Sequence, residues 1–521
     1  MDVKTLLSKG YFPKELPPPF SSQSFANAAD QVTKRWKRAS EPARKKFRES
    51  TCVKYSIPRI NYSRRIISIP NPLHQHALVE VIAANWAQLV KFCKQSKLSA
   101  SRPIVDSSGL RAVSTLKKFS EYKRAYVKDS FDRLFEIRTD IARFFPSIYT
   151  HSIAWAIHGK AAAKKNRGNR RALGNALDIA VRACQSNQTI GIPIGPDTSI
   201  VLSEIIGTAI DVMLKEKYQV NGYRFVDDYH LFCKTHAEAE HLLKYLQSCF
   251  AKFELDMNDA KTDIVKFPQP FESKWTIELS SFGFSRNAKR QRLQIGQFFS
   301  LLYQSCHEHP EESVVKYGIK VLHRCSLQKA NWSYLESLLL KTVIAFPQTL
   351  PELFFYLESH RSYVDKTILR RALLEILRNH SDKGHSFEVC WVLWIAKFYQ
   401  IRIPAKDIVP IIESQDVIPT IVAFDLYHSK LVSGKLDVRS IGPVLTEDSL
   451  LDDHWLLTYE LLKKGWIRKK NNPLKASQYF KILQDLKVDF YDSSKRSISK
   501  KLISRRPTVR DLSKIPLEGG Y

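Results

Sequence analysis

Glycine and long apolar runs are both scarce in this chain. Its 521 residues include only 18 glycines, which disfavours an all-β architecture rich in tight loops. No stretch approaches the roughly 20 apolar residues that a membrane-spanning helix needs. The first residues, MDVKTLLSKGYF, contain no apolar run long enough for a signal peptide. We therefore expect a soluble intracellular protein with no membrane partner.

Paired cysteines are absent as well. No cysteine lies in a CxxC pair, and no second matching pair of His or Cys residues stands at zinc-ligand spacing. This pattern argues against zinc-finger modules and is typical of reduced, mostly buried thiols in a cytosolic protein. The cysteines are Cys52, Cys93, Cys184, Cys233, Cys249, Cys306, Cys325 and Cys390.

Basic residues are in large excess over acidic ones. The chain has 81 Lys and Arg against 52 Asp and Glu, a formal net charge of +29. Such a field attracts polyanions, of which nucleic acid is the commonest. The alternative is a generally basic surface with no specific partner. With 44% hydrophobic residues, the chain should form well-packed domains, and its length predicts two or three of them.

Three regions differ in their patterns. Residues 1–50 hold the proline run LPPPF and then eight basic side chains between Lys34 and Arg48, which suits a helix along a phosphate backbone or a solvated amphipathic helix. Residues 51–290 alternate strand and helix patterns, which predicts an α/β layer. Residues 291–521 show successive amphipathic helices broken by prolines, without strand alternation. That pattern is typical of an α-solenoid, although no fixed-period repeat is found.

A pair of adjacent aspartates carries the main chemical signal. Asp227 and Asp228 lie in GYRFVDDYHLFCK, where two apolar and aromatic arms predict a β-hairpin. Two neighbouring carboxylates repel each other, and a bound divalent cation relieves this repulsion. Magnesium prefers such hard oxygen ligands. The alternative is a DD turn in a surface hairpin, because DD pairs are common.

A third carboxylate strengthens the metal hypothesis. Asp140, in EIRTDIARFFPSIYTHS, follows an apolar strand and precedes a helix start, where α/β sheets place ligand-binding residues. Asp140 and Asp227 could hold two metal ions, one activating a primer hydroxyl and the other holding the leaving pyrophosphate. Three aspartates without local Cys or His ligands favour Mg²⁺ or Mn²⁺ over zinc.

At these residues the sequence resembles the reverse transcriptases. TDIARFFPSIY is similar to their motif A, and GIPIGPDTSIVLSEII is similar to motif B. YRFVDDY is similar to motif C, with Phe225 in place of the usual Tyr. LDMNDAKTDIV, FGF and RRIISIPNPLHQHAL are similar to motif D, motif E and the fingers motif, respectively. The motifs follow the family's order, which is more specific than any one of them. The resemblance covers about residues 50–290. It implies an α+β fold, in which a right-hand polymerase core of fingers and palm, with an antiparallel sheet and helices, precedes an all-α, helical-repeat-like C-terminal domain.

The resemblance also implies roles for single residues. The positions used for catalysis and metal binding correspond to Asp140, Asp227 and, as a less essential neighbour, Asp228. The positions near the incoming nucleotide correspond to Arg65, Phe145, Gly195 and Lys261, and those of the primer grip to Phe282 and Gly283. A ring at Phe145 would collide with a ribose 2′-hydroxyl, which predicts the use of dNTPs. The alternative roles are ordinary ones: surface cations, core aromatics and turn glycines.

The segment GYFPKELPPPF and the helical C-terminal half resemble the bacterial abortive-infection and defence-associated reverse transcriptases. This resemblance implies a cytoplasmic bacterial protein acting in anti-phage defence, with protein-primed and sometimes template-independent DNA synthesis. It also implies DNA or RNA partners, an associated RNA and a closed homo-oligomer, a trimer or a hexamer. A protein primer needs a hydroxyl that reaches the metals, and Tyr11 and Tyr521 are candidates on grounds of mobility. The motif B loop reads GIPIGPD, without the Gln of many template-copying enzymes.

Two other functions stay open at this point. One is a conventional RNA-templated reverse transcriptase of a mobile element. The other is a nucleic-acid-binding scaffold with a vestigial polymerase site. The intact aspartates argue against the scaffold, because acidic side chains in a basic cleft repel phosphate unless a metal is present.

Overall fold

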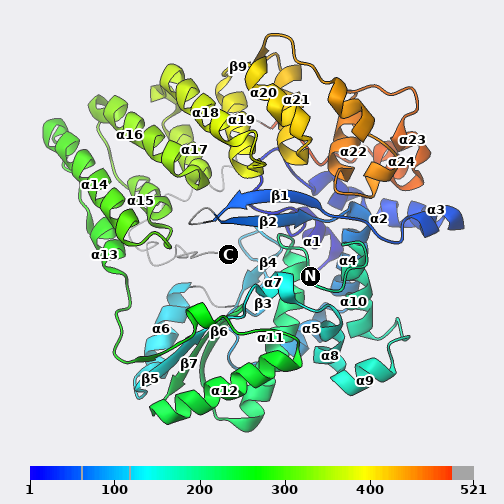
Figure 1. Ribbon diagram of the computed structural model, residues 1–521, viewed down its shortest axis with the longest axis vertical. Helices are drawn as coiled ribbons and strands as arrows, with labels where there is room; N and C mark the ends of the chain where they lie inside the picture. The colour runs from blue at the N-terminus through cyan, green and yellow to red at the C-terminus, as the bar shows by residue number, and fades with distance from the viewer. Residues whose placement is uncertain (60–62, 117–118, 496–521) are drawn as a thin grey trace.

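The structure is a computed structural model that describes residues 1–59, 63–116 and 119–495. In Figure 1 a sheet with its helices lies at the bottom, a long β-hairpin crosses the middle, and an arc of helices lies above it. This mixture of antiparallel sheet and helices, with helices following it along the chain, confirms the predicted α+β class. None of the described helices is both long enough and apolar enough to cross a membrane.

The central sheet has four strands in the order β6-β7-β5-β8, all antiparallel. They are β5 (Phe135–Thr139), β6 (Asn221–Phe225), β7 (Asp228–Cys233) and β8 (Asp263–Lys266). The strands form because buried residues alternate along them, and Ile137, Tyr229 and Leu231 are fully buried on one face. The predicted hairpin around the two aspartates is therefore β6 and β7, and the predicted strand before Asp140 is β5.

Two long helices pack against each other and against this sheet. They are α11 (Asp197–Lys217) and α12 (His236–Lys252). The ring of Tyr229 on β7 lies 5.5 Å from that of Phe250 on α12, and its hydroxyl donates to Asp211 on α11 at 3.2 Å. Because α11 is covered on most sides, it tolerates apolar residues around its whole circumference.

A second hairpin lies between the sheet and the arc (Figure 1). Its strands are β1 (Val53–Pro58) and β2 (Arg64–Ile69), and α4 (Pro72–Ala84) follows them. The Ser68 N–H donates to the Ile194 carbonyl at 2.8 Å, which joins β2 to the loop ahead of α11. On the other side, Arg64 donates two hydrogen bonds to Glu388 at 2.7 and 2.8 Å. The hairpin is thus attached to both halves of the chain.

The N-terminal segment packs against the last described part of the chain. Its helices are α1 (Val3–Lys9), which lies on α4, and α2 (Gln23–Lys37), which lies on α24 (Gln478–Asp485). Tyr11 and Phe25 form an aromatic cluster with Phe490, and Phe20 makes a β-bridge with Tyr491. The proline run therefore braces the two ends of the described chain against each other.

The C-terminal half is a succession of helices, most of which pack against their second neighbour along the chain. They are α13 (Lys274–Ser281), α14 (Ala288–Glu308), α15 (Val314–Leu322), α16 (Trp332–Ala345), α17 (Leu350–Ser359), α18 (Lys366–His380), α19 (Ser386–Tyr399), α20 (Ala405–Ser414), α21 (Val417–His428), α22 (Trp455–Lys463) and α23 (Pro473–Ala476). This arrangement is typical of stacked helical repeats. One short parallel strand pair, which the sequence did not predict, interrupts it, formed by β9 (Ile403–Pro404) and β10 (Val432–Ser433).

The remaining elements connect these parts. They are α3 (Glu41–Lys46), α5 (Trp86–Cys93), β3 (Pro103–Val105), β4 (Val113–Thr115), α6 (Phe119–Ser130), α7 (Phe144–Ser147), α8 (His151–His158), α9 (Lys160–Lys165) and α10 (Leu173–Ala183). The 3-10 helices are η1 (Asp259–Lys261), η2 (Lys329–Asn331), η3 (Pro347–Thr349), η4 (Arg361–Tyr363), η5 (Arg439–Val444) and η6 (Asp448–Leu450).

Candidate active site

The turn between β6 and β7 presents the two aspartates. Val226 and Asp227 form the loop, and Asp228 begins β7 opposite Phe225. Val226 has a φ of 59°, in the left-handed region that a β-branched residue avoids at a cost of about 1–3 kcal/mol. Two-residue hairpin loops require such a conformation. The strained turn keeps Asp227 buried at the end of the sheet, with 8% of its surface exposed.

Hydrogen bonds to both sides of Val226 hold this turn. Its N–H donates to the Ser101 hydroxyl at 2.8 Å, and its carbonyl accepts from Arg224 Nη1 at 2.9 Å. The Arg224 side chain is itself fully buried. The conformation of the turn is therefore fixed by groups that do not touch solvent.

Arg224 lies between two buried carboxylates of α11. Its guanidinium donates to Glu204 at 2.9 and 3.0 Å and to Asp211 at 2.9 and 3.1 Å. Burial lowers the pKa of Arg224, but the two carboxylates outweigh it and raise the pKa, so the guanidinium stays charged. A β-carbon at Gly207 would lie 2.5 Å from Arg224 Cζ, which leaves no room for a side chain on that part of α11.

Asp140 reaches the same end of the sheet from the neighbouring strand. Thr139 on β5 pairs with Tyr229 on β7, so the residue after Thr139 lies beside the β6–β7 turn. Asp140 is buried, and its Oδ2 accepts a hydrogen bond from Lys261 Nζ at 2.6 Å. Its Oδ1 is shielded from solvent and has no hydrogen-bond partner among the described residues.

The pKa of Lys261 reports the charge around this point. Partial burial lowers it, but the hydrogen bond that Lys261 donates to Asp140 and the charges of Asp140, Asp228 and Asp227 raise it overall. The three carboxylates that the sequence singled out therefore lie close enough to act on one ammonium group. The Lys261 side chain is 63% exposed and can leave Asp140 without disturbing the core.

The donor set suits a hard divalent cation. The site offers carboxylate oxygens from Asp140, Asp227 and Asp228, and the buried Oδ1 of Asp140 has no hydrogen-bond partner among the described protein atoms. Magnesium and manganese favour such oxygen ligands, whereas zinc favours nitrogen or sulfur. The residues present thus fit the predicted Mg²⁺ or Mn²⁺.

Phe145 lies next to the loop that leads into α11. It belongs to α7, is half-buried, and its carbonyl accepts from the Ile192 N–H at 3.0 Å. Gly191 in the same loop has a φ of 83°, and a β-carbon there would lie 3.1 Å from the Pro146 carbonyl oxygen. The segments predicted as motifs A and B are therefore in direct contact.

Gly195 brings the hairpin β1–β2 against this loop. Its φ is 128°, and a β-carbon would lie 2.7 Å from Ile67 Cγ2 and 2.9 Å from Pro13 Cγ. Arg65 lies two residues before Ile67 on β2, so its side chain projects from the same face of the hairpin. That face is directed toward the loop, and Gly195 is required for their close approach.

The primer-grip and priming candidates have different surroundings. The rings of Phe282 and Phe284 pack on Phe298 of α14, with centroids 5.3 and 5.6 Å away, whereas a β-carbon at Gly283 would meet nothing within 4 Å. Tyr11 is fully buried, and its hydroxyl donates to the Pro70 carbonyl at 2.5 Å. The prediction that Tyr11 is mobile, which made it a priming candidate, is therefore wrong. Tyr521 lies outside the described residues.

Sequence reasoning missed the buried network under the turn. Its signal was nevertheless present, because Glu204 and Asp211 lie two turns apart on one face of a mostly buried helix, and Arg224 interrupts an aromatic strand. Polar residues at helical spacing in a buried helix point to a common partner. Only the fold shows that this partner is Arg224.

A family model matches the part of the chain that contains the four-stranded sheet but not the hairpin β1–β2. Residues 107–320 match the family model described as reverse transcriptase (RNA-dependent DNA polymerase). No curated protein matches the chain. Among solved structures, apo telomerase from Candida tropicalis is 11% identical, with a TM-score of 0.30 over 66% of this chain and 68% of that one. Telomerase from Candida albicans in complex with a TWJ fragment of telomeric RNA is 13% identical, with a TM-score of 0.28 over 67% of each chain. TM-scores this low do not define a shared overall fold.

Replacement of Gly207 by alanine tests the network. The change should gain about 1 kcal/mol of helix propensity, but it displaces Arg224 from its carboxylates, at a cost of roughly 3–5 kcal/mol. We expect the free energy of unfolding to fall by about 2 kcal/mol or more, measured by denaturant unfolding.

Gly296→Ala provides the matched control. This glycine also lies within a helix, and its β-carbon would meet the hydroxyl of Tyr334, which is partly exposed and free to rotate. The control should be neutral or stabilising by about 1 kcal/mol. Equal stability of the two variants would contradict the tight contact at Gly207.

Proposed function

We propose that the chain synthesises DNA from dNTPs with two divalent cations held by Asp140 and Asp227. The match of residues 107–320 to the reverse transcriptase family model indicates a nucleotidyltransferase of that class. The observation that carries this proposal is the meeting of Asp140, Asp227 and Asp228 around the ammonium group of Lys261. Asp228 acts as a secondary ligand. Buried carboxylates gathered at one end of a sheet, in a chain with a net charge of +29, suit a metal-dependent reaction on a polyanion.

The bound cations would activate the primer hydroxyl and neutralise the leaving pyrophosphate. The residues of this chain position the reactants. Lys261 donates a hydrogen bond to Asp140 Oδ2, and its exposed side chain can turn to the triphosphate when a cation takes its place. Arg65 on β2 provides a second cationic side chain for the triphosphate.

Substitution of either ligand should abolish synthesis. Asp140→Asn and Asp227→Asn each remove a charge that the cations need, so we expect the rate of dNTP incorporation to fall by about 10²–10³-fold or more. Incorporation of labelled dNTPs with Mg²⁺ or Mn²⁺ measures the loss. Asp263→Asn, at an exposed carboxylate on β8, is the control and should keep the parental rate. Retained synthesis in a folded Asp227→Asn variant would refute the assignment.

Phe145 should determine the choice of sugar. Replacement by alanine opens space for a 2′-hydroxyl, so the ratio of kcat/KM for NTP to that for dNTP should rise by about 10–100-fold. The ratio is used because Phe145 also packs against the core, and a general loss of activity would change both substrates alike. Phe271→Ala, at an exposed aromatic ring, is the control. An unchanged ratio in Phe145→Ala would remove Phe145 from the sugar-binding site.

We propose further that this polymerase acts in the bacterial cytoplasm in anti-phage defence. In this role it is protein-primed and independent of a template, and it works as a homo-oligomer with an associated RNA. The resemblance of the N-terminal segment and helical half to defence-associated reverse transcriptases supports this role, as does the motif B loop without Gln. A conventional RNA-templated enzyme of a mobile element is the second candidate, supported by the family match itself.

Incubation of the purified chain with each dNTP singly, without template, distinguishes these roles. Protein priming predicts labelled DNA that stays attached to the chain in a denaturing gel and is released by nuclease. Tyr521→Phe should abolish the attachment, whereas Tyr11→Phe should not, because Tyr11 is buried. Synthesis that requires an added RNA and copies its sequence would support the templated enzyme instead. Absence of incorporation under every condition would favour the binding scaffold.

A further inference from the structure

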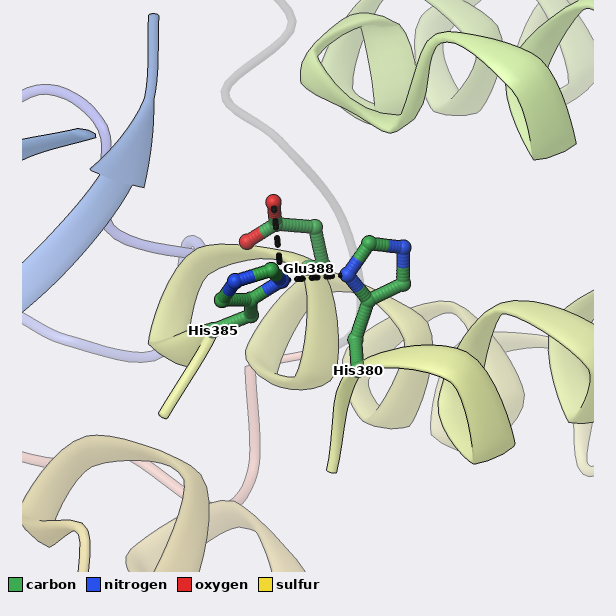
Figure 2. A group of neighbouring side chains, drawn as sticks. All are labelled: His380, His385 and Glu388. Atoms are coloured by element: carbon green, nitrogen blue, oxygen red, sulfur yellow. Dashed lines mark hydrogen bonds and ion pairs between the residues drawn. The ribbon is translucent and has the colours of Figure 1, made fainter. Parts of the chain in front are cut away.

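Three side chains with metal-binding atoms converge at the turn between α18 and α19, in the C-terminal arc (Figure 2). His380 ends α18, His385 immediately precedes α19, and Glu388 lies in the first turn of α19. The Nδ1 atoms of the two histidines are 2.6 Å apart, and His385 Nδ1 is 4.0 Å from Glu388 Oε1. The three candidate ligand atoms all lie within 4.8 Å of one another.

The two facing nitrogen atoms need either a proton or a cation between them. A neutral imidazole carries a proton on one ring nitrogen and a lone pair on the other. If both rings carry the proton on Nε2, the Nδ1 lone pairs of His380 and His385 point at each other and repel, unless a cation lies between them. Otherwise one ring must adopt the Nδ1–H tautomer and donate to its neighbour.

Burial favours the neutral form of both rings. Burial lowers the pKa of His380, assisted by the charges of Lys383 and Arg64, while Glu388 opposes the shift. Burial also lowers the pKa of His385, again with help from Arg64 and against Glu388. Neutral imidazole is the ligand form of histidine. His385 remains 23% exposed, which gives an ion access from solvent.

We propose that His380, His385 and Glu388 form a binding site for a first-row divalent transition-metal ion, of which Zn²⁺ is the representative. Two imidazole nitrogens and one carboxylate oxygen, with water as the fourth ligand, are a common tetrahedral set for zinc. Magnesium, with its preference for oxygen ligands, is not expected here. This site is separate from Asp140, Asp227 and Asp228 and would hold a different metal.

The geometry needs only small adjustments. Tetrahedral bonds of about 2.0–2.1 Å place ligand atoms roughly 3.3 Å apart. The His380–His385 separation would therefore widen and the His385–Glu388 separation would shorten, each by about 0.7 Å. Rotation of the side chains provides this, because His385 is the residue before α19 and its backbone is outside the helix.

Glu388 connects this site to the hairpin. Its carboxylate is 1% exposed and accepts both hydrogen bonds from Arg64 on β2. A metal ion on Oε1 would compete with Arg64 for the same charge, because two cations share one carboxylate. Metal binding at this site and the Arg64–Glu388 ion pair that holds β2 would therefore be coupled through the Glu388 side chain.

Zinc retention by the full-length chain tests the site. The parent protein for this test has no histidine tag and carries Asp140→Asn and Asp227→Asn, so that the candidate active site takes up no metal. It is stripped with chelator, loaded with Zn²⁺ and desalted. We expect a single equivalent of zinc by mass spectrometry in the parent and its loss in His380→Ala and in His385→Ala. His454→Ala is the matched control, since His454 lies in an acidic cluster with one imidazole, and it should retain the zinc. Lack of zinc in the folded parent, or equal zinc in all variants, would overturn the proposal.

Two further measurements do not depend on the stability of the histidine variants. With Cu²⁺ as the probe, the electron paramagnetic resonance spectrum of the same parent should show coupling to two imidazole nitrogens. Arg64→Met should bind Zn²⁺ roughly tenfold more tightly, because the competing charge is gone. A spectrum without nitrogen coupling would overturn the proposal. An affinity unchanged by Arg64→Met would remove Glu388 from the ligand set and so overturn the three-residue site.

Discussion

The guanidinium of Arg224 is fully buried between Glu204 and Asp211, and the position of the acidic turn depends on this arrangement. A buried charge is tolerated only when it is paired and its hydrogen bonds are satisfied. Here one guanidinium joins α11 to β6 and also bonds to the carbonyl of Val226. Arg224 and its two carboxylates therefore do more than stabilise the core, because they hold Val226, the residue next to Asp227, in an unfavourable backbone conformation.

The carboxylates at that turn present the opposite problem. Asp140, Asp227 and Asp228 lie close together, and their mutual repulsion is balanced in this structure by the ammonium group of Lys261. A flexible lysine can be displaced, whereas the Arg224 guanidinium cannot, since Glu204 and Asp211 hold it on both sides. The fold thus separates a fixed counter-charge, which positions the turn, from an exposed and flexible one at the carboxylates.

Sequence patterns predicted the local features of this site and few of the distant ones. The hairpin and the strand before Asp140 followed from alternation over a few residues, which depends on neighbours in the chain. Tyr11 was misjudged because its position near a terminus suggested mobility, whereas its burial depends on Phe490, at the other end of the described chain. The partner of Arg224 was likewise invisible, because it depends on which face of α11 meets the sheet.

The histidine cluster shows the same limit in another form. Four residues separate His380 from His385, and this spacing is visible in the sequence. A pair of histidines is nevertheless a weak signal for a metal site without further ligands. Glu388 becomes the third ligand only because α19 begins at Ser386 and places it one turn from His385. Sequence spacing can suggest part of a metal site, and the helix boundary completes it.

The helical arc also constrains the hairpin that borders the active site. On one side of β2, Ser68 bonds to the loop ahead of α11, and on the other Arg64 bonds to Glu388. The Trp455 indole N–H donates to the Ile69 carbonyl at 3.3 Å, which adds a second contact from the arc. Any displacement of the hairpin relative to the four-stranded sheet must therefore break polar contacts with the arc or carry the arc with it. The C-terminal half is in this sense a structural part of the candidate active site, since it restricts where the strand carrying Arg65 can lie.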